Sequence, residues 1–269
     1  MTSTTPAAGS AARWGPLWGA RPQDWAATEE QQIPTYEEAI RRVGVERGQL
    51  VLDIGCGSGV FLRLAADRGA EVFGFDASEA LIEVARGRVP DADLRVGDMQ
   101  FLPYEDDTFD LVTGFNSFFF ADDMPAAVRE AGRVAKPGAP VVIQVWGRPE
   151  ACDLETMKAA VRPFRPPPPP GTPPAPRLWD PGVLEQIAAD AGLTPGAAFD
   201  HAWAFEYPDD DALVRGMASA GGLAELVGPS GQEALRAALL DALAPYRTPS
   251  GGYRLQNEWH YLIAYAAHP

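Results

Sequence analysis

Apolar and polar positions repeat along this chain with two different periods. Short apolar runs predict buried strands, and they alternate with stretches of helical periodicity. Strands that alternate with helices favour an α/β fold with a mostly parallel sheet. The runs that predict the first five strands are Gln49–Ile54, Glu71–Phe75, Asp93–Val96, Phe109–Thr113 and Pro140–Trp146. The helical stretches between and before them are Thr35–Val43, with Thr35 as a possible N-cap, the segment after Gly59, Glu79–Arg86 and Pro125–Ala135.

The second half of the chain predicts two more strands and a helical insertion. A helix, Pro181–Ala191, precedes a sixth strand in which every second residue from Phe199 to Tyr207 is aromatic or histidine. Helical periodicity covers Asp209–Tyr246, and Arg254–Ala267 predicts the last strand. The prolines 166–170 favour polyproline II, and we prefer a stiff surface connection to a partner-docking segment.

The residues before the first strand predict an arm outside the sheet. The first dozen are rich in Thr, Ser, Ala and Pro, which predicts disorder. Trp14, Trp18 and Trp25 follow within a short space, and they either pack the arm onto the core or form a lid over a ligand cleft. The chain therefore divides into an arm or lid, residues 1–35, and a domain, residues 36–269.

The segment QLVLDIGCGSGV, residues 49–60, contains the strongest ligand motif. Gly55, Gly57 and Gly59 follow the first strand at alternate positions, and glycine lets the backbone turn sharply and approach a ligand. Asp53, just before them, would repel the pyrophosphate of a dinucleotide but would suit a ligand with an amino group and a sulfonium. VLDIGCGSG resembles motif I of the class I S-adenosylmethionine-dependent methyltransferases.

A second segment extends this resemblance. LPYEDDTFDLV, residues 102–112, is similar to the LPFPDxSFDLV signature of one group of that family. This group acts on small molecules and is known as the methyltransferase type 11 or ubiquinone-biosynthesis-like group. The resemblance implies a Rossmann-like, doubly wound seven-stranded sheet of order 3-2-1-4-5-7-6 with strand seven antiparallel. In that order strand six ends, and strand seven starts, at the ligand edge. Residues 208–257 are therefore expected to form a helical cap over the cofactor site.

Acidic residues at strand ends complete the expected site for S-adenosylmethionine. Asp76 lies 21 residues after Gly55, where an acid suits the ribose hydroxyls, and it is also a possible helix N-cap. The resemblance implies that Asp98 meets the adenine amino group and that Met99 packs on the ring. Cys56 is expected to matter through its backbone N–H. The predicted cofactor residues are Asp53, Gly55, Cys56, Gly57, Gly59, Asp76, Ala77, Asp98, Met99 and Asn116.

Aromatic residues near the ligand edge are candidates for the acceptor site. The segment 114–120 follows the fourth strand, where ligands of open α/β sheets bind, and its phenylalanines either line a pocket or anchor the next helix. The predicted acceptor residues are Trp18, Phe118, Phe119, Trp146, Tyr207 and Tyr253.

Histidines supply one candidate for a catalytic base. His260 lies near the start of strand seven, at the cofactor edge, where an imidazole could accept a proton near neutral pH. A hydrogen-bonded strand histidine remains an equal alternative. His201 is expected at the far edge, among core aromatics. No metal is expected, because Cys56 and Cys152 lack ligand spacing and Asp122 and Asp123 fit a helix start.

Charge and composition narrow the range of partners. The formal net charge is −15, from 22 Lys and Arg against 37 Asp and Glu, which disfavours nucleic acid and anionic membranes. No apolar run approaches the ~20 residues of a membrane span, and the first residues lack the apolar core of a signal peptide. A cytoplasmic enzyme is the expectation.

The motifs together predict methyl transfer from S-adenosylmethionine to a small, apolar or aromatic acceptor. O- or N-methylation, in natural-product biosynthesis, is the expected form. Two alternatives stay open at this point. One is an enzyme of this fold that uses the bound cofactor for a cyclisation or rearrangement, and the other is a non-catalytic cofactor-binding scaffold.

Overall fold

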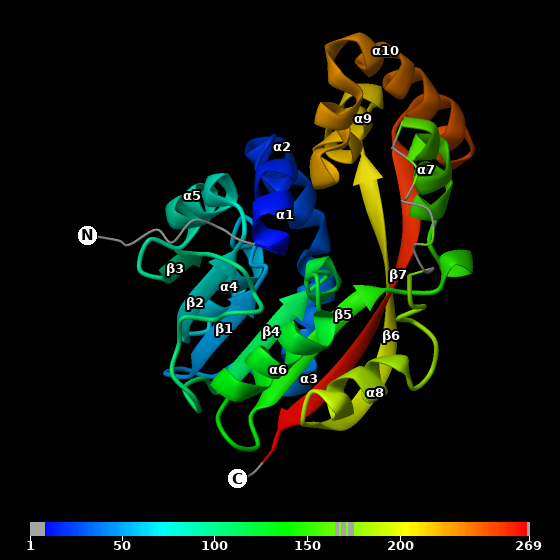
Figure 1. Cartoon of the computed structure of the whole chain (residues 1–269). Coiled ribbons are helices and arrows are strands. Elements are labelled where there is room, and N and C mark those ends of the chain that lie inside the picture. Colours follow the sequence, from blue (N-terminus) through cyan, green and yellow to red (C-terminus); the bar gives the residue numbers. More distant parts are fainter. Residues whose placement is uncertain (1–8, 165–166, 168–170, 172–174, 268–269) are drawn as a thin grey trace.

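A computed structural model describes residues 9–164, 167, 171 and 175–267 (Figure 1). The predicted disorder of residues 1–8 lies outside these residues, as does most of the predicted polyproline segment 166–170. The disorder prediction is wrong for residues 10–12, because helix α1 begins at Ser10 and its first turn packs against Asp98.

Seven strands form one sheet of order β3-β2-β1-β4-β5-β7-β6. Strand β7 pairs antiparallel with both of its neighbours, and the remaining pairs are parallel. The predicted topology is therefore confirmed. The strands are β1 Leu50–Ile54, β2 Glu71–Asp76, β3 Asp93–Val96, β4 Leu111–Phe115, β5 Pro140–Trp146, β6 Leu193–Tyr207 and β7 Tyr253–Ala266.

Helices cover both faces of this sheet, as the doubly wound prediction requires. Alternate residues of β1 point to opposite sides, so Val51 joins one apolar cluster and Leu52 the other. The first cluster receives residues of α3, α4 and α5, and the second receives residues of α6 and α8. The helices are α1 Ser10–Trp18, α2 Pro22–Glu29, α3 Ile33–Val43, α4 Val60–Ala66, α5 Glu79–Arg88, α6 Met124–Val134, α7 Leu154–Val161, α8 Val183–Asp190, α9 Asp210–Ser219 and α10 Leu223–Leu243.

Three element boundaries differ from the sequence prediction for local reasons. Thr35 is not an N-cap but lies inside α3, where its hydroxyl donates to the Gln32 carbonyl. Phe109 forms only an isolated bridge to Ala135, so β4 starts at Leu111. Strand β6 starts at Leu193, and a register shift between Pro195 and Ala198 interrupts the alternation that sequence reading relies on.

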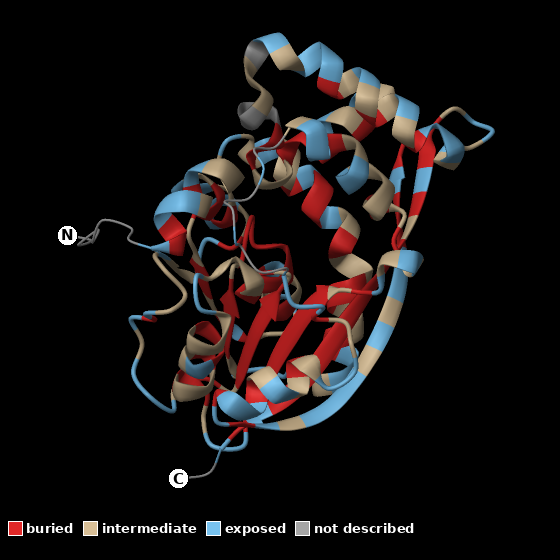
Figure 2. Cartoon of the chain, turned by 45° about the vertical axis from the view of Figure 1, so that its right-hand side comes forward, coloured by how far each residue is buried: buried red, intermediate tan, exposed pale blue. Residues whose placement is uncertain are grey.

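Strands β6 and β7 extend beyond the rest of the sheet and hold the cap helices. Figure 1 shows α7, α9 and α10 gathered around this extension. The outer face of β6 is largely exposed, whereas the central strands are buried (Figure 2). The single helical stretch predicted for 209–246 is broken at Gly221 and Gly228, which adopt non-helical conformations with φ of +58° and +62°.

The arm lies between the cap and the carboxyl ends of the central strands (Figure 1). Helix α2 contacts α9, and α1 contacts the short 3-10 helix Ala220–Gly222. A Cβ on Gly222 would stand 2.7 Å from Cδ2 of Leu17, so cap and arm are in close contact. The cap therefore packs on the arm, and the arm lies over the strand ends.

Candidate functional site

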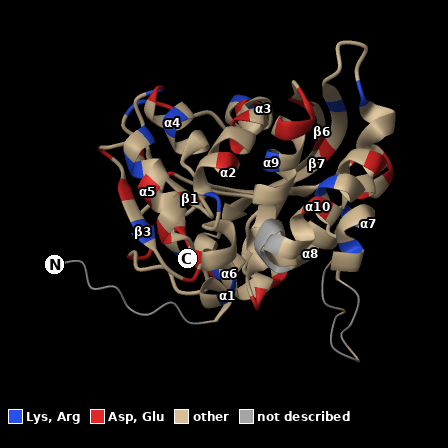
Figure 3. Ribbon diagram, turned by 90° about the horizontal axis from the view of Figure 1, so that it is seen from above, with Lys and Arg blue, Asp and Glu red and all other residues tan. Residues whose placement is uncertain are grey.

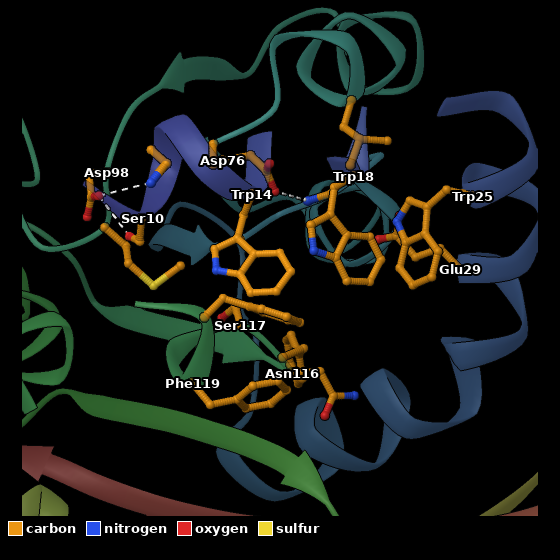
Figure 4. A pocket seen from close by; sticks show the side chains of 18 of the residues that line it. Ser10, Trp14, Trp18, Trp25, Glu29, Asp76, Asp98, Asn116, Ser117 and Phe119 are labelled. Atoms are coloured by element: carbon orange, nitrogen blue, oxygen red, sulfur yellow. Dashed lines mark hydrogen bonds between the residues drawn. The ribbon is translucent and has the colours of Figure 1, made fainter. Parts of the chain in front are cut away.

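A pocket lies beneath the arm at the carboxyl ends of β1, β2 and β4 (Figure 4). Its empty space is about 860 Å³, counting open solvent at the mouth. The described residues that line it are Ser10, Ala11, Trp14, Trp18, Trp25, Glu29, Gln32, Tyr36, Gly55, Gly57, Asp76, Ala77, Leu81, Gly97, Asp98, Met99, Phe115, Asn116, Ser117, Phe119, Phe120 and Trp146.

The glycine loop forms one wall, and its backbone requires glycine. Gly55 and Gly57 have φ of +76° and +54°, in the region that L side chains rarely adopt. A Cβ on Gly55 would stand 2.4 Å from Cβ of Ser117. Gly59 supports the loop from behind as the left-handed N-cap of α4, and a Cβ there would stand 3.0 Å from Ala85 Cβ. The loop therefore packs closely against Ser117 and α5, and side chains at Gly55 and Gly59 would not fit.

Two predicted cofactor residues lie beneath this wall rather than in it. Asp53 is buried, and the Thr113 hydroxyl donates to its Oδ1 at 2.7 Å. Cys56 is also buried, and its backbone N–H donates to the Phe75 carbonyl at 3.2 Å, so this N–H is already bonded within the protein. The expected role of the Cys56 N–H in ligand binding is not supported by this bonding.

Asp76 ends β2 and lines the pocket as predicted. Its carboxylate accepts from the Gly57 N–H at 2.9 Å and from the Ser78 N–H at 2.8 Å. Burial raises the pKa of Asp76, and these backbone hydrogen bonds oppose that rise. The N-cap of α5 is Ser78, whose hydroxyl accepts from the Leu81 N–H, so the alternative role of Asp76 as N-cap is wrong. The two backbone hydrogen bonds therefore hold the Asp76 carboxylate in place at the pocket.

Replacing Asp76 by alanine should weaken S-adenosylmethionine binding by ~1.5–3 kcal/mol, the scale of lost hydrogen bonds to a charged group. The expected cause is loss of the acceptor for the ribose hydroxyls. Calorimetric titration measures the change. The matched control is Asp67→Ala, since Asp67 pairs with Arg63 on the surface of the chain and lies outside the pocket. Unchanged affinity in a folded Asp76→Ala protein would contradict the ribose assignment.

Asp98 joins the sheet to the arm. The Ser10 hydroxyl and the Ala11 N–H donate to its Oδ2 at 2.7 Å and 3.1 Å, and the Gln100 N–H donates to its Oδ1 at 3.0 Å. The first turn of α1 therefore begins on this carboxylate, as the dashed lines in Figure 4 show. Met99 lines the pocket beside it.

The three arm tryptophans all lie in the wall of the pocket. Trp18 stands between Trp25 and Phe120, with ring centroids 4.6 Å and 5.5 Å away, and Trp14 lies 4.8 Å from Phe120. A Cβ on Gly15 would come within 2.3 Å of the Ala77 carbonyl oxygen, so α1 sits directly on the loop after β2. The arm thus forms the roof of the pocket.

We expect the arm to exchange its amide hydrogens more slowly when S-adenosylhomocysteine is bound. The roof contacts the glycine loop and the strand ends, so a ligand between them adds contacts to both. Hydrogen exchange of residues 12–36 with and without the ligand tests this. Identical protection in both states would mean that the arm only packs on the fold and does not respond to the ligand.

The loop after β4 brings unpartnered polar groups to the pocket. Asn116 has φ of +51°, a strained value for a residue other than glycine. Both polar atoms of its side-chain amide are buried without a hydrogen-bond partner, as is the Ser117 hydroxyl. Gln32 Oε1 and the Trp14 indole N–H are also buried without a hydrogen-bond partner. Buried polar groups are normally bonded, so this wall is suited to a ligand that supplies the missing partners.

The predicted acceptor residues divide into two sets. Trp18, Phe119 and Trp146 line the pocket. Phe118 is buried in the core, where its ring would meet a Cβ on Gly114 at 2.2 Å. Tyr207 is buried at the cap, against Gly216, and the Tyr253 hydroxyl donates to Asp210 at 2.8 Å. The structure therefore does not bring Phe118, Tyr207 or Tyr253 to the pocket.

His260 lies at the expected position along β7 but on the other face of the sheet. It pairs with Val145, whereas its neighbour Trp259 pairs with Trp146, and paired strand residues share a face. Trp146 lines the pocket and stacks on Trp259 at 5.2 Å. The imidazole Nδ1 is instead 2.6 Å from Asp200. This geometry does not support a base at the pocket, and it matches the alternative of a hydrogen-bonded strand histidine.

Glu29 was not identified from the sequence. It ends α2, is buried, and its Oε2 accepts from the Ser58 N–H at 2.8 Å within the glycine loop. Its segment, WAATEE, follows no strand and matches no motif, so the sequence contained no signal for it. With Glu29, Asp76 and Asp98, the described lining is acidic and includes no Lys or Arg. Such a wall favours a cationic ligand.

Charged residues elsewhere on the surface are arranged differently. Figure 3 shows basic and acidic residues interspersed over α3, α4 and α5. Ion pairs there include Arg41–Glu38, Arg63–Asp67 and Arg86–Glu83. The pocket therefore differs from the surface in holding acids without basic neighbours in its wall. Within the described ranges, no helix is long and apolar enough to span a membrane, and no group of three His, Cys, Asp or Glu side chains could hold a metal ion.

Comparison with known proteins agrees with this geometry. Residues 52–143 match the family described as "Methyltransferase domain". The chain is 36% identical over 153 residues to a demethylmenaquinone methyltransferase of Renibacterium salmoninarum, covering 51% of this chain and 65% of the relative. It is 33% identical over 144 residues to a 2-phytyl-1,4-naphtoquinone methyltransferase of Trichormus variabilis, covering 50% and 62%. The matches thus span less than two thirds of each relative's length.

The solved structure of a putative methyltransferase from Bacillus halodurans has the same fold. It superposes with a TM-score of 0.60 and 15% identity, over 87% of this chain and all of that one. At this identity the likeness concerns the fold alone.

Proposed function

Because the chain carries a methyltransferase domain of the class I S-adenosylmethionine-dependent family, we propose that it transfers a methyl group from that cofactor to a small, apolar or aromatic acceptor. The observation that carries this proposal is a single pocket whose wall combines carboxylates with aromatic rings. The carboxylates suit the cofactor, and the rings suit the acceptor.

The residues present fit S-adenosylmethionine. Gly55 and Gly57 line the pocket without side chains, and Asp76 faces the pocket with its carboxylate held by backbone N–H groups. Asp76 would hold the ribose, and Asp98 with Met99 would hold the adenine. Since the described wall is acidic, it also complements the positive charge of the cofactor.

The aromatic residues of the pocket wall support an aromatic acceptor. Trp146, Phe119 and Phe120 provide flat apolar surface there, and Asn116 and Ser117 provide buried polar atoms without partners. Rings stack on such a surface, while a hydroxyl or carbonyl of the acceptor would bond the amide of Asn116. The two named relatives act on quinone-type aromatic compounds, which is the acceptor class we propose to test first.

Alignment is the main catalytic contribution that these residues make. The bound cofactor supplies an electrophilic methyl carbon on a sulfonium, which has a thioether as leaving group. Asn116 and the aromatic wall would orient an oxygen or nitrogen of the acceptor toward that carbon, and the arm would exclude water. No histidine is among the described lining residues, so the proposal uses positioning and no imidazole base.

The test is incubation with methyl-labelled S-adenosylmethionine and a panel of phenols, naphthoquinols and aromatic amines. Label in one acceptor, with S-adenosylhomocysteine formed in equal amount, supports the proposal, and the position of the label identifies the methylated atom. An acceptor that is rearranged without label would indicate the cyclisation alternative. Cofactor binding without any reaction across the panel would indicate a scaffold.

A further inference from the structure

Glu29 is an arm residue that reaches into the glycine loop. Its side chain is buried, and Oε2 accepts from the Ser58 N–H at 2.8 Å. A Cβ on Gly57 would stand 2.9 Å from Oε2 and 3.1 Å from Oε1, so both carboxylate oxygens lie against the loop. Glu29 also lines the pocket (Figure 4). It therefore belongs to the site although it lies far from the motif in sequence.

The surroundings of Glu29 do not neutralise its charge. The charge of Arg88 on α5 acts on Glu29, but the guanidinium of Arg88 donates to the Ser58 carbonyl and hydroxyl and pairs with Glu30. The other ionisable groups that interact with Glu29 are Asp76 on β2, Asp53 on β1, Tyr36 on α3 and Cys56 in the glycine loop. Burial, with the charge of Asp76, raises the pKa of Glu29 to about 7, and hydrogen bonds from the Ser58 side chain and backbone N–H and the charge of Arg88 oppose this rise.

Burying a carboxylate without a neutralising partner is unfavourable, so the position of Glu29 requires an explanation. Holding the glycine loop in place would explain the bond to Ser58, but an uncharged acceptor would serve that purpose without burying a charge. The position of Glu29 relative to the other acids is informative. Asp98 would hold the adenine and Asp76 the ribose, whereas Glu29 lies against Gly57, which donates to Asp76 from the loop. The remaining part of the cofactor, its amino-acid end, carries an ammonium group.

We propose that Glu29 binds the α-ammonium of S-adenosylmethionine, so that the arm supplies the counter-ion for the amino-acid end of the cofactor. This inference rests on the proposed function and adds a binding residue outside the motif. It also gives the arm a direct part in the site, because the ligand would link α2 to the glycine loop. The nearby acids Asp53 and Asp76 reinforce the negative potential there.

The test compares two ligands that differ at the amino-acid end. S-adenosylhomocysteine has the ammonium, whereas 5′-methylthioadenosine keeps the adenine, ribose and sulfur but lacks the amino acid. Glu29→Gln keeps an oxygen for the Ser58 N–H and removes the charge. We expect it to lower the affinity for S-adenosylhomocysteine by ~10-fold or more and the affinity for methylthioadenosine by less than ~2-fold. Titration calorimetry measures both.

Glu37→Gln is the matched control, because Glu37 lies on α3, pairs with Arg68 and is outside the pocket. It should change neither affinity. The melting temperature of ligand-free Glu29→Gln at about pH 8 should equal or exceed that of the wild type, since the substitution removes a buried charge. A lower melting temperature would show that the carboxylate is structural and would overturn the inference.

Two further results would also overturn it. Equal loss for both ligands would mean that Glu29 acts only by holding the arm on the loop. Unchanged affinity for S-adenosylhomocysteine with loss of turnover would make Glu29 a base for the acceptor. A wild-type protein that binds neither ligand would instead overturn the proposed function itself, and that outcome is visible before any variant is made.

Discussion

Replacing Gly55 by alanine is expected to destabilise the protein by roughly 2–5 kcal/mol and to weaken cofactor binding by about 100-fold. Gly55 has φ of +76°, and an added Cβ would stand 2.4 Å from Cβ of Ser117. The Ser117 atom is next to the backbone, so it cannot move aside as the end of a long side chain would. The backbone strain and the overlap both push the glycine loop away from the loop after β4.

Urea unfolding measures the first effect, and titration with S-adenosylhomocysteine measures the second. Gly182→Ala separates strain from overlap, because Gly182 has φ of +84° but an added Cβ would meet nothing within 4 Å. That control should cost only ~1–2 kcal/mol and leave affinity unchanged. If the two variants behaved alike, the contact between Gly55 and Ser117 would not matter for the pocket.

The parts of this fold that depend on local patterns could be predicted from the sequence. The predicted third and fifth strands have the observed bounds, Asp93–Val96 and Pro140–Trp146. The fifth is an apolar run of the kind that is buried inside a sheet covered on both faces, whereas the third, DLRV, is a partly exposed strand at the edge of the sheet. The order of the strands came from the family resemblance of the glycine motif and not from periodicity, since periodicity contains no information on which strands are neighbours.

His260 shows what strand direction alone cannot provide. Antiparallel pairing places the start of β7 beside the end of β5, and His260 indeed pairs with Val145. The side on which a residue points depends on the register, and a shift of one residue reverses it. The register puts Trp259 on the pocket side and His260 beside Asp200. Sequence reasoning thus reached the correct strand end and had no means of choosing the face.

Contacts between distant segments were the least predictable feature. The insertion 208–257 was expected over the cofactor site, yet no described residue of it lines the pocket. The arm occupies that position, and the cap lies on the arm through contacts such as Gly222 with Leu17. Glu29 was missed for the same reason, because its contact with Ser58 joins two residues 29 positions apart in a way that no local pattern encodes.

Replacing Asp53 by asparagine is expected to stabilise the ligand-free protein by roughly 2–4 kcal/mol at about pH 8 and to have little effect at about pH 4. Burial raises the pKa of Asp53 to about 8, the Thr113 hydrogen bond opposes this, and Glu29 and Asp76 add to it. The folded chain therefore holds this proton after the unfolded chain has released it. The contribution of this retained proton to the free energy of unfolding is fully present below about pH 4 and is lost as the pH rises through about 8.

Asparagine removes that loss because it has no charge at any pH and can still accept from the Thr113 hydroxyl. At about pH 8, where a large part of Asp53 is ionised, the same change should weaken S-adenosylmethionine binding by ~10-fold, since a negative charge beneath the glycine loop is gone. Urea unfolding between about pH 4 and 8 and titration calorimetry test both statements. Asp67→Asn is the control, because Asp67 pairs with Arg63 on the surface and should alter neither. If Asp53→Asn raises the stability but lowers the affinity, this carboxylate serves ligand binding and not folding. If the variant is less stable than the wild type at about pH 8, the fold needs the charge of Asp53.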